Sequence, residues 1–230
     1  NYDEVAYYHG TDNGQLHIAY TLAANCLKYK WALENGDEEL LEDATRVVRK
    51  GVAAIRSTFA ATNGGIGPEF PGTLARFACA YKHREYAPFM FQEHVRHFNG
   101  TGKYHNWRIR LYTSRDELGG FCLSAASVLK YIDPSANKDS KWCVNTMRLI
   151  VAQLIEGFKD TNWLITGGHG EPVGSDINSY LEGSTWKLAV LRLGATAYPE
   201  KYESLYHYEA AKVLSMGGAS MGSVTNAANG

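Results

Sequence analysis

The chain has 230 residues, of which 45% are hydrophobic and 20% charged, and its formal net charge is −1. This composition is typical of a globular protein with a sizeable core and argues against a broad basic surface for nucleic acid. No apolar run approaches the ~20 residues of a membrane-spanning helix, so we expect neither a nucleic-acid nor a membrane partner. The sequence starts at Asn1 without a signal-like segment. We expect a processed product or a fragment and favour an extracellular or virion-associated location.

Two helices are predicted in the first quarter of the chain. Apolar residues recur at helical spacing over residues 15–33, and Asn35-Gly36 ends this helix. Asp37 caps a second helix that runs to about Phe59, and a glycine-rich turn follows it. The short turn between the two helices predicts an αα-hairpin.

The next segment, residues 61–113, is irregular and rich in glycine, proline, histidine and aromatic residues. A short helix is predicted over about residues 89–98, after Pro88. His94 and His97 would then share one helix face, a spacing compatible with a metal. The sequence marks no third ligand, so we favour a packed or solvated pair and expect no metal site.

The third helix is predicted within "YTSRDELGGFCLSAASVLKYI", residues 112–132. Ser114 and Glu117 match the capping box, in which each side chain bonds the backbone N–H of the other. Arg115 and Asp116 then fall in the first turn. Asp116 either complements the helix dipole there or presents its carboxylate to a substrate, and the sequence leaves both roles open.

Three more helices are predicted over about residues 140–158, 177–197 and 200–214. We therefore expect a single domain over residues 1–214, and a small-residue tail, 215–230, that is flexible or docked on a partner. No long strand pattern occurs, so the predicted fold class is all-α.

Loop lengths predict how the helices are arranged. Turns within successive helix pairs are short, whereas the connections before and between pairs, residues 1–14, 61–113 and 159–176, are long. Stacked αα-hairpins bring such connections to one end, and long loops in compact domains are often functional. We expect the hairpins to form a partial (α/α) toroid. Its exposed apolar flanks would require a partner, either a homo-oligomer or a larger assembly.

The long connections, together with the start of the third helix, hold the candidate catalytic carboxylates. Glycoside hydrolysis needs two carboxylates about 5 to 10 Å apart, and Asp116, Glu171 and Asp12 are the available set. Glu171 lies in "GGHGEPVG", which is equally a loop that needs special backbone angles, and Asp12 is equally a helix cap. His169 stands two residues before Glu171 and could assist it.

The same segments, again with the start of the third helix, hold candidate substrate-binding residues. Arg76 and Arg115 suit a substrate carboxylate, although Arg76 could instead pair with Glu69. Trp107 and Trp163 either stack on sugar rings or fill the core. No phosphate loop and no nucleophile elbow occur, so we expect no cofactor and no serine or cysteine catalysis.

A family resemblance covers about residues 10–200. The helical stretch that begins "DNGQLHIAYTLAANCLKYKWALENGDEELL", followed by "GTLARF", "TSRDELGG" and "GHGEPVG", resembles the (α/α)-toroid carbohydrate-active proteins. That group includes unsaturated glucuronyl hydrolases and related glycosidases, lyases and epimerases. The resemblance implies a substrate cleft at the loop end, with chemistry at Asp116 and also at Asp12 and Glu171. Arg76 and Arg115 would suit acidic sugars. Complete toroids of this kind have more helices than this chain.

Our leading hypothesis is a carbohydrate-active or carbohydrate-binding protein that acts on an oligosaccharide by carboxylate acid/base chemistry. An oligosaccharide that contains uronic acid is one candidate substrate. The alternative is a non-catalytic structural subunit of a larger assembly, such as a filament or virion component, built on a degenerate toroid. A helical-repeat module that binds protein is a third hypothesis.

Overall fold

The fold is mainly helical. A computed structural model of the chain describes residues 13–167, 169–177 and 182–227. The described residues form six α-helices: α1 (Gly14–Asn35), α2 (Glu38–Asn63), α3 (Arg115–Tyr131), α4 (Lys138–Asp160), α5 (Glu182–Ala197) and α6 (Pro199–Ala227). The predicted predominance of helix is therefore confirmed. Over the described residues, no helix is long and apolar enough to cross a membrane.

The helix boundaries follow local capping chemistry. Asp37 Oδ1 accepts a hydrogen bond from Leu40 N at 3.0 Å at the start of α2. Asn137 caps α4 in the same way, because its Oδ1 accepts from Ser140 N at 2.8 Å. Gly36 ends α1 with φ 67°, a left-handed conformation that glycine adopts without steric cost.

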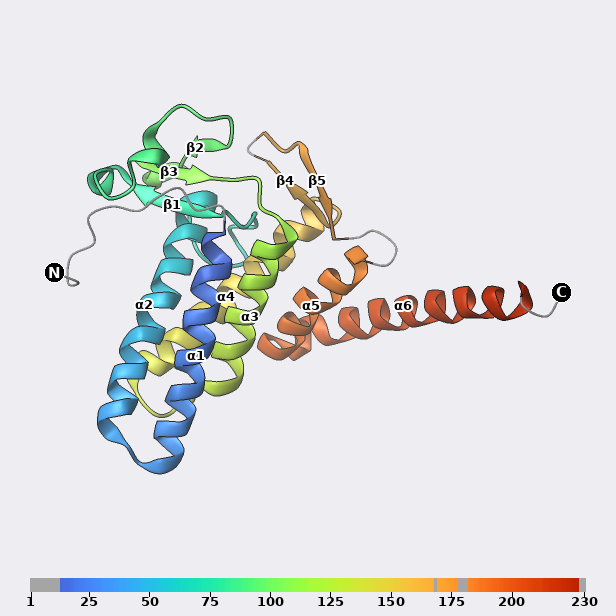
Figure 1. The fold of residues 1–230 in the computed structure, drawn as a ribbon, viewed down its shortest axis with the longest axis horizontal. Coiled ribbons are helices and arrows are strands. Elements are labelled where there is room, and N and C mark those ends of the chain that lie inside the picture. The colour runs from blue at the N-terminus through green and yellow to red at the C-terminus, as the bar shows by residue number, and fades with distance from the viewer. Residues whose placement is uncertain (1–12, 168, 178–181, 228–230) are drawn as a thin grey trace.

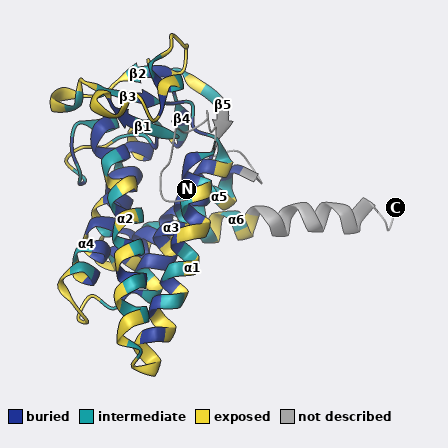
Figure 2. Cartoon of the chain, turned by 60° about the vertical axis from the view of Figure 1, so that its left-hand side comes forward, coloured by how far each residue is buried: buried dark blue, intermediate teal, exposed yellow. Residues whose placement is uncertain are grey.

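Helices α1 and α2 form one antiparallel pair, α3 and α4 form a second, and the two pairs pack side by side. Helix α1 contacts both α2 and α3, α2 also contacts α4, and α3 contacts α4 and α5. Figure 1 shows α1 and α3 side by side and running in the same direction. The core lies between these helices, where the rings of Phe59 and Phe121 are 5.4 Å apart and buried residues line the inward faces (Figure 2).

Short strands are present, which the sequence did not predict. The first long connection contains β1 (Phe77–Ala80), β2 (His97–Asn99) and β3 (Trp107–Arg110), which form an antiparallel sheet in the order β1-β3-β2. The second contains β4 (Leu164–Thr166) and β5 (Pro172–Asp176), which pair with each other. The mainly all-α class is kept, and these short strands are an addition to it. Within each connection, the segments obtain backbone hydrogen bonds from one another rather than from water.

The predicted helix over residues 89–98 is wrong. A single 3-10 turn, η2 (Pro88–Phe91), is followed by loop and then by β2. His94 and His97 therefore share no helix face, although their ring centroids are only 4.8 Å apart. His94 Nδ1 accepts a hydrogen bond from Arg96 N at 3.1 Å, and His97 Nδ1 lies 3.3 Å from Gln92 O. Both rings are thus bonded to nearby backbone.

The last helix is longer than predicted. Helix α6 continues past residue 214 to Ala227, through the segment whose composition predicted a flexible or docked tail. Figure 1 shows it extending away from the other helices. Its first turn packs against α4, since the hydroxyl of Tyr202 donates to Glu156 Oε1 at 2.7 Å and Lys201 pairs with the same carboxylate at 2.9 Å.

The predicted capping box at the start of α3 is also wrong. Ser114 makes no side-chain cap bond, and the Glu117 side chain is fully buried against α1. Glu117 Oε2 accepts the N–H of Gln15 at 2.8 Å, and the carboxylate also accepts the N–H of Leu16. These N–H groups belong to the first turn of α1, where the helix offers no partner of its own. Glu117 therefore caps α1 from a different helix.

Two glycines allow this close approach. A Cβ at Gly120 would lie 2.6 Å from the Cα of Leu16, and a Cβ at Gly14 would lie 2.4 Å from the carbonyl oxygen of Arg76. Any larger residue at either position would push backbone against backbone. The first turn of α1 thus fits between α3 and the strand that follows Arg76.

We expect Glu117→Gln to flatten the dependence of stability on pH. Burial raises the pKa of Glu117 from 4.5 to about 7, although the N–H groups of Gln15 and Leu16 and the nearby Arg76 oppose the rise. Between these values the folded chain holds a proton that the unfolded chain has lost, so the free energy of unfolding falls as pH rises. Relative to Glu117→Gln, the wild type should lose about 3 kcal/mol between about pH 4 and pH 8 in urea titrations. If the two proteins differ in free energy of unfolding by the same amount at every pH, Glu117 is not a buried carboxylate that caps α1.

We expect Gly120→Ala to destabilise the protein by about 1–3 kcal/mol, because the added methyl group overpacks the backbone contact between α1 and α3. Gly119→Ala is the matched control on the same helix. Its Cβ would meet only the ring of Trp186, at 3.1 Å, and a side chain can shift more easily than backbone. Thermal melts of the two variants test the difference, and equal melting temperatures would disprove the proposed close contact.

Candidate functional site

The long connections meet at one end of the helices. Figure 1 shows the β1–β3 sheet, the β4–β5 pair and the start of α3 at the same end. We call this end the loop rim and define it as residues 61–113, 159–176 and the first turn of α3. A hydrogen bond between Tyr112 and Glu171 joins the two connections, which confirms the predicted convergence. Asp12 and the rest of residues 1–12 lie outside the described residues.

Tyr112 is the residue at which the two connections meet. Its hydroxyl donates a short hydrogen bond to Glu171 Oε1, while Glu171 Oε2 accepts the N–H of His169 at 2.9 Å. The carbonyl oxygen of Tyr112 accepts a hydrogen bond from Arg76 Nε at 2.7 Å. Tyr112 adopts φ 62°, which is uncommon for a residue other than glycine and is found more often at functional sites. One residue thus holds both a carboxylate and a guanidinium.

These hydrogen bonds keep Glu171 ionised. The Tyr112 hydroxyl, and then backbone N–H groups including that of His169, hold the pKa of Glu171 below its ordinary value. The pKa of Tyr112 is raised in turn by the same hydrogen bond. An ionised carboxylate accepts protons or hydrogen bonds and can act as a nucleophile, but it cannot serve as a general acid.

Aromatic rings and a further cation surround this pair. The ring of Phe98 stacks on Tyr112 with centroids 6.3 Å apart and planes 21° apart. His169 meets Phe98 edge-on at 5.2 Å, and the guanidinium of Arg96 lies 5.6 Å from the centroid of the Tyr112 ring. Flat apolar rings beside hydrogen-bonding groups form the kind of surface that binds the C–H face of a sugar.

A small cavity opens nearby, between the ends of α2 and α4 and strand β4. Its volume is about 240 Å³. The lining is mixed, with one aromatic ring, one carboxylate and several hydroxyl and amide groups: Asn63, Pro71, Gly72, Thr73, Gly157, Phe158, Asp160, Thr161, Leu164 and Thr166. Thr166 pairs with Pro172, the residue after Glu171, so the cavity lies beside the strand pair that carries Glu171.

The first turn of α3 places two more predicted residues at the rim. The Asp116 side chain is exposed, and Arg115 is half-buried beside it. The negative charge of Asp116 acts on the buried Glu117 and raises the pKa of that carboxyl. Asp116 therefore lies next to the α1 cap without taking part in it, and its carboxylate is available to a ligand.

The two predicted tryptophans differ in position: Trp163 lies in the main core, whereas Trp107 packs against the small cluster that also holds Phe98 and Tyr112. Trp163 is only 7% exposed and belongs to the core, where its ring stacks on Phe158 at 5.8 Å and Lys187 Nζ lies 4.8 Å from the ring centroid. Its predicted role in sugar stacking is corrected, because both of its faces are covered. Trp107 is half-buried at the start of β3 and meets Tyr104 edge-on at 5.9 Å.

Sequence reasoning missed Tyr112, Phe98 and Arg96. Tyr112 stands just before the predicted third helix, and its left-handed backbone has no signature in the sequence. Phe98 and Arg96 fell in the predicted short helix, where their spacing gave no reason to place them near Glu171. A long-range pairing of the two connections brings them together.

The described residues hold no group of three or more histidine, cysteine, aspartate or glutamate side chains arranged for a metal. The four cysteines are free thiols. Burial raises the pKa of Cys26, Cys122 and Cys143 to about 12, and it also raises the pKa of Cys79. Thiolate is therefore scarce at neutral pH, and a cysteine nucleophile has no support.

Comparisons of the chain with protein-family models, with curated proteins and with solved structures found no match. A function for this chain therefore has to be inferred from the geometry of the loop rim.

We expect Tyr112→Phe to raise the pKa of Glu171, because the substitution removes the hydroxyl that stabilises the ionised carboxylate. NMR titration of side-chain carboxyl carbons measures the change directly. Tyr104→Phe is the matched control, since Tyr104 contacts Trp107 and Lys103 through its ring. An unchanged pKa of Glu171 in folded Tyr112→Phe would contradict the hydrogen bond.

Proposed function

We propose that the chain binds an oligosaccharide at the loop rim and acts on it by carboxylate acid/base chemistry. The observation that carries the proposal is the Tyr112–Glu171 pair, which presents an ionised carboxylate among aromatic rings at the end where the long connections meet. The helical hairpins would form part of an (α/α) toroid, with the loop rim as the mouth of its cleft.

The two carboxylates would have different roles. Glu171 is ionised, so it suits the general base, the nucleophile or the group that stabilises positive charge on the sugar. A general acid must come from elsewhere. Asp116, the exposed carboxyl in the first turn of α3, would be the second carboxylate of the pair, and it would have to be protonated when substrate is bound in order to act as the acid. Glu117 has the higher pKa, but it is fully buried and caps α1, so it has no access to substrate.

The cations of the loop rim favour an acidic sugar. Arg76 is fixed against the carbonyl of Tyr112, Arg96 lies by the Tyr112 ring, and Arg115 adjoins Asp116. A planar guanidinium binds a carboxylate through two parallel hydrogen bonds. A uronic acid unit would thus be held beside Glu171 by an arginine rather than repelled by the carboxylate.

A non-catalytic structural subunit is the second candidate. Helix α6 extends away from the other helices, and its Tyr208 and Leu214 side chains are 65% and 76% exposed (Figure 1). Exposed large apolar residues on a projecting helix favour contact with another chain. In this case α6 would bind another chain of the assembly, and the loop rim would not be catalytic.

We expect Asp116→Asn and Glu171→Gln each to lower turnover of a cleaved glycan by at least about 100-fold, the usual contribution of an acid or base. The screen uses neutral and uronic oligosaccharides, with reducing-end release and ultraviolet absorbance as readouts for hydrolysis and elimination. Glu42→Gln is the control, because Glu42 is an exposed carboxylate on α2 and lies in a separate groove that also contains Lys138 at the start of α4.

Melting temperatures establish that each variant is folded. Full turnover by folded Asp116→Asn would disprove its role as the acid. Failure of the wild type to bind or cleave any glycan, combined with growth of ordered polymers in light scattering, would favour the structural subunit.

A further inference from the structure

Helix α1 has two apolar faces, and the chain covers only one. Gln15, Ala19, Leu22, Cys26 and Tyr29 face the core and are at most 1% exposed. At 100° per residue, a second row lies on the opposite side of the helix. Its members are Tyr20, Ala24, Leu27 and Trp31, and we call them the outer stripe.

The outer stripe is unusually exposed for its composition. Tyr20 is 62%, Leu27 51% and Trp31 54% exposed, and Ala24 is exposed as well. A helix that is apolar on all sides is normally buried on all sides. Spacings of four, three and four residues between the members match the seam of a helix that pairs with another helix.

We propose that a second copy of this chain packs its own α1, antiparallel, against the outer stripe. The inference is independent of the sugar site, because the outer stripe runs along α1 rather than over the loop rim. The inference rests on the complementarity between the outer stripes of two copies when a two-fold axis between Asn25 and Cys26 relates them.

That axis pairs residues of complementary size. Tyr20 lies opposite the partner's Trp31, and Ala24 lies opposite the partner's Leu27. The contact is the same in both directions, as a two-fold interface requires. Small residues therefore face large ones, and two aromatic pairs lie at the two ends of the stripe.

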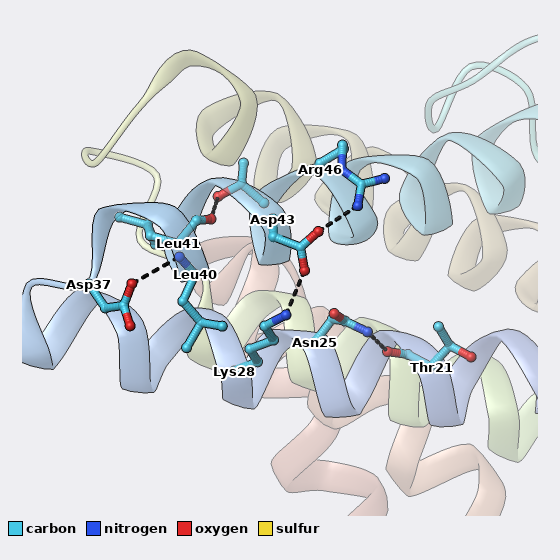
Figure 3. A network of polar contacts seen from close by, with 9 residues as sticks. Thr21, Asn25, Lys28, Asp37, Leu40, Leu41, Asp43 and Arg46 are labelled. Carbon is cyan, nitrogen blue, oxygen red and sulfur yellow. Dashed lines mark hydrogen bonds and ion pairs between the residues drawn. The ribbon is translucent and has the colours of Figure 1, made fainter.

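The charges along α1 also agree with this pairing. His17 lies at the level of the partner's Glu34, so no two like charges meet at either end of the stripe. The two lysines beside the stripe already have partners within the chain: Lys28 Nζ lies 2.5 Å from Asp43, and Lys30 Nζ lies 3.5 Å from Glu34. Figure 3 shows Lys28 directed across to Asp43, which also binds Arg46. A second copy would thus meet few uncompensated charges.

The size of the stripe predicts a weak dimer. Its three large side chains expose roughly 350 Å² in each copy, below the ~800 Å² per partner of a stable interface. We therefore expect association in the micromolar range, with monomer and dimer both populated at accessible concentrations.

Sedimentation equilibrium of the whole chain tests the proposal. The wild type should show a monomer–dimer equilibrium, and Trp31→Ala should raise its dissociation constant at least tenfold. Tyr208→Ala is the matched control, because Tyr208 is an equally exposed aromatic residue on a different helix, α6. Circular dichroism establishes that both variants are folded. If Tyr208→Ala raises the dissociation constant and Trp31→Ala does not, the interface lies on α6 and the proposal is overturned.

Disulfide trapping tests the register. Residues 17 and 34 of one α1 are about 26 Å apart along the helix, so cysteines at both sites can join only between copies. Mixing His17→Cys with Glu34→Cys under mild oxidation should give a covalent dimer. Each variant alone keeps the four native thiols and should give none. If no mixed dimer forms, or if the chain stays monomeric at every concentration, a second copy does not pack on the outer stripe and the proposal is overturned.

Discussion

The structure depends on one buried carboxylate. Glu117 accepts N–H groups from the first turn of α1, and so fixes the start of α1 against the start of α3. A buried charge is costly unless hydrogen bonds and nearby positive charge compensate it. Here the positive end of the α1 dipole and Arg76 supply part of that compensation, and burial still raises the pKa of Glu117 to about 7. Gly14 and Gly120 remove the side chains that would otherwise keep these segments apart.

This arrangement also organises the loop rim. The residue before Glu117 is Asp116, so the contact that anchors α3 sets the position of the proposed acid. Arg76 acts on Glu117 and also binds the backbone of Tyr112, whose hydroxyl holds Glu171. A series of contacts therefore links the α1 cap to the carboxylate of the second connection. The stability of the helices and the geometry of the site are consequently not separate properties of this chain.

The sequence predicted the features that local chemistry determines. Asp37, Gly36 and the glycines after Asn63 set helix ends close to where the structure has them. Loop lengths alone predicted that residues 61–113 and 159–176 would meet. The helical hairpins were predicted from the short turns within each pair, whereas their extension into a toroid stays a prediction.

The features that the sequence did not predict depend on distant partners. The pattern from Ser114 to Glu117 matches a local cap, but Glu117 bonds Gln15, which is 102 residues away in the chain. Strands of three to five residues are too short to show alternation, and pairing between segments determines them.

Helix α6 has a consequence for the hydrodynamic behaviour of the molecule. A helix of 29 residues is about 44 Å long, and much of this one projects as a rod from the remaining helices. Such a rod raises the frictional coefficient of the molecule far more than it raises the molecular mass. A single copy of 25.5 kDa will therefore elute early from a sizing column, as though it were a larger particle. Elution volume alone would mistake elongation for association.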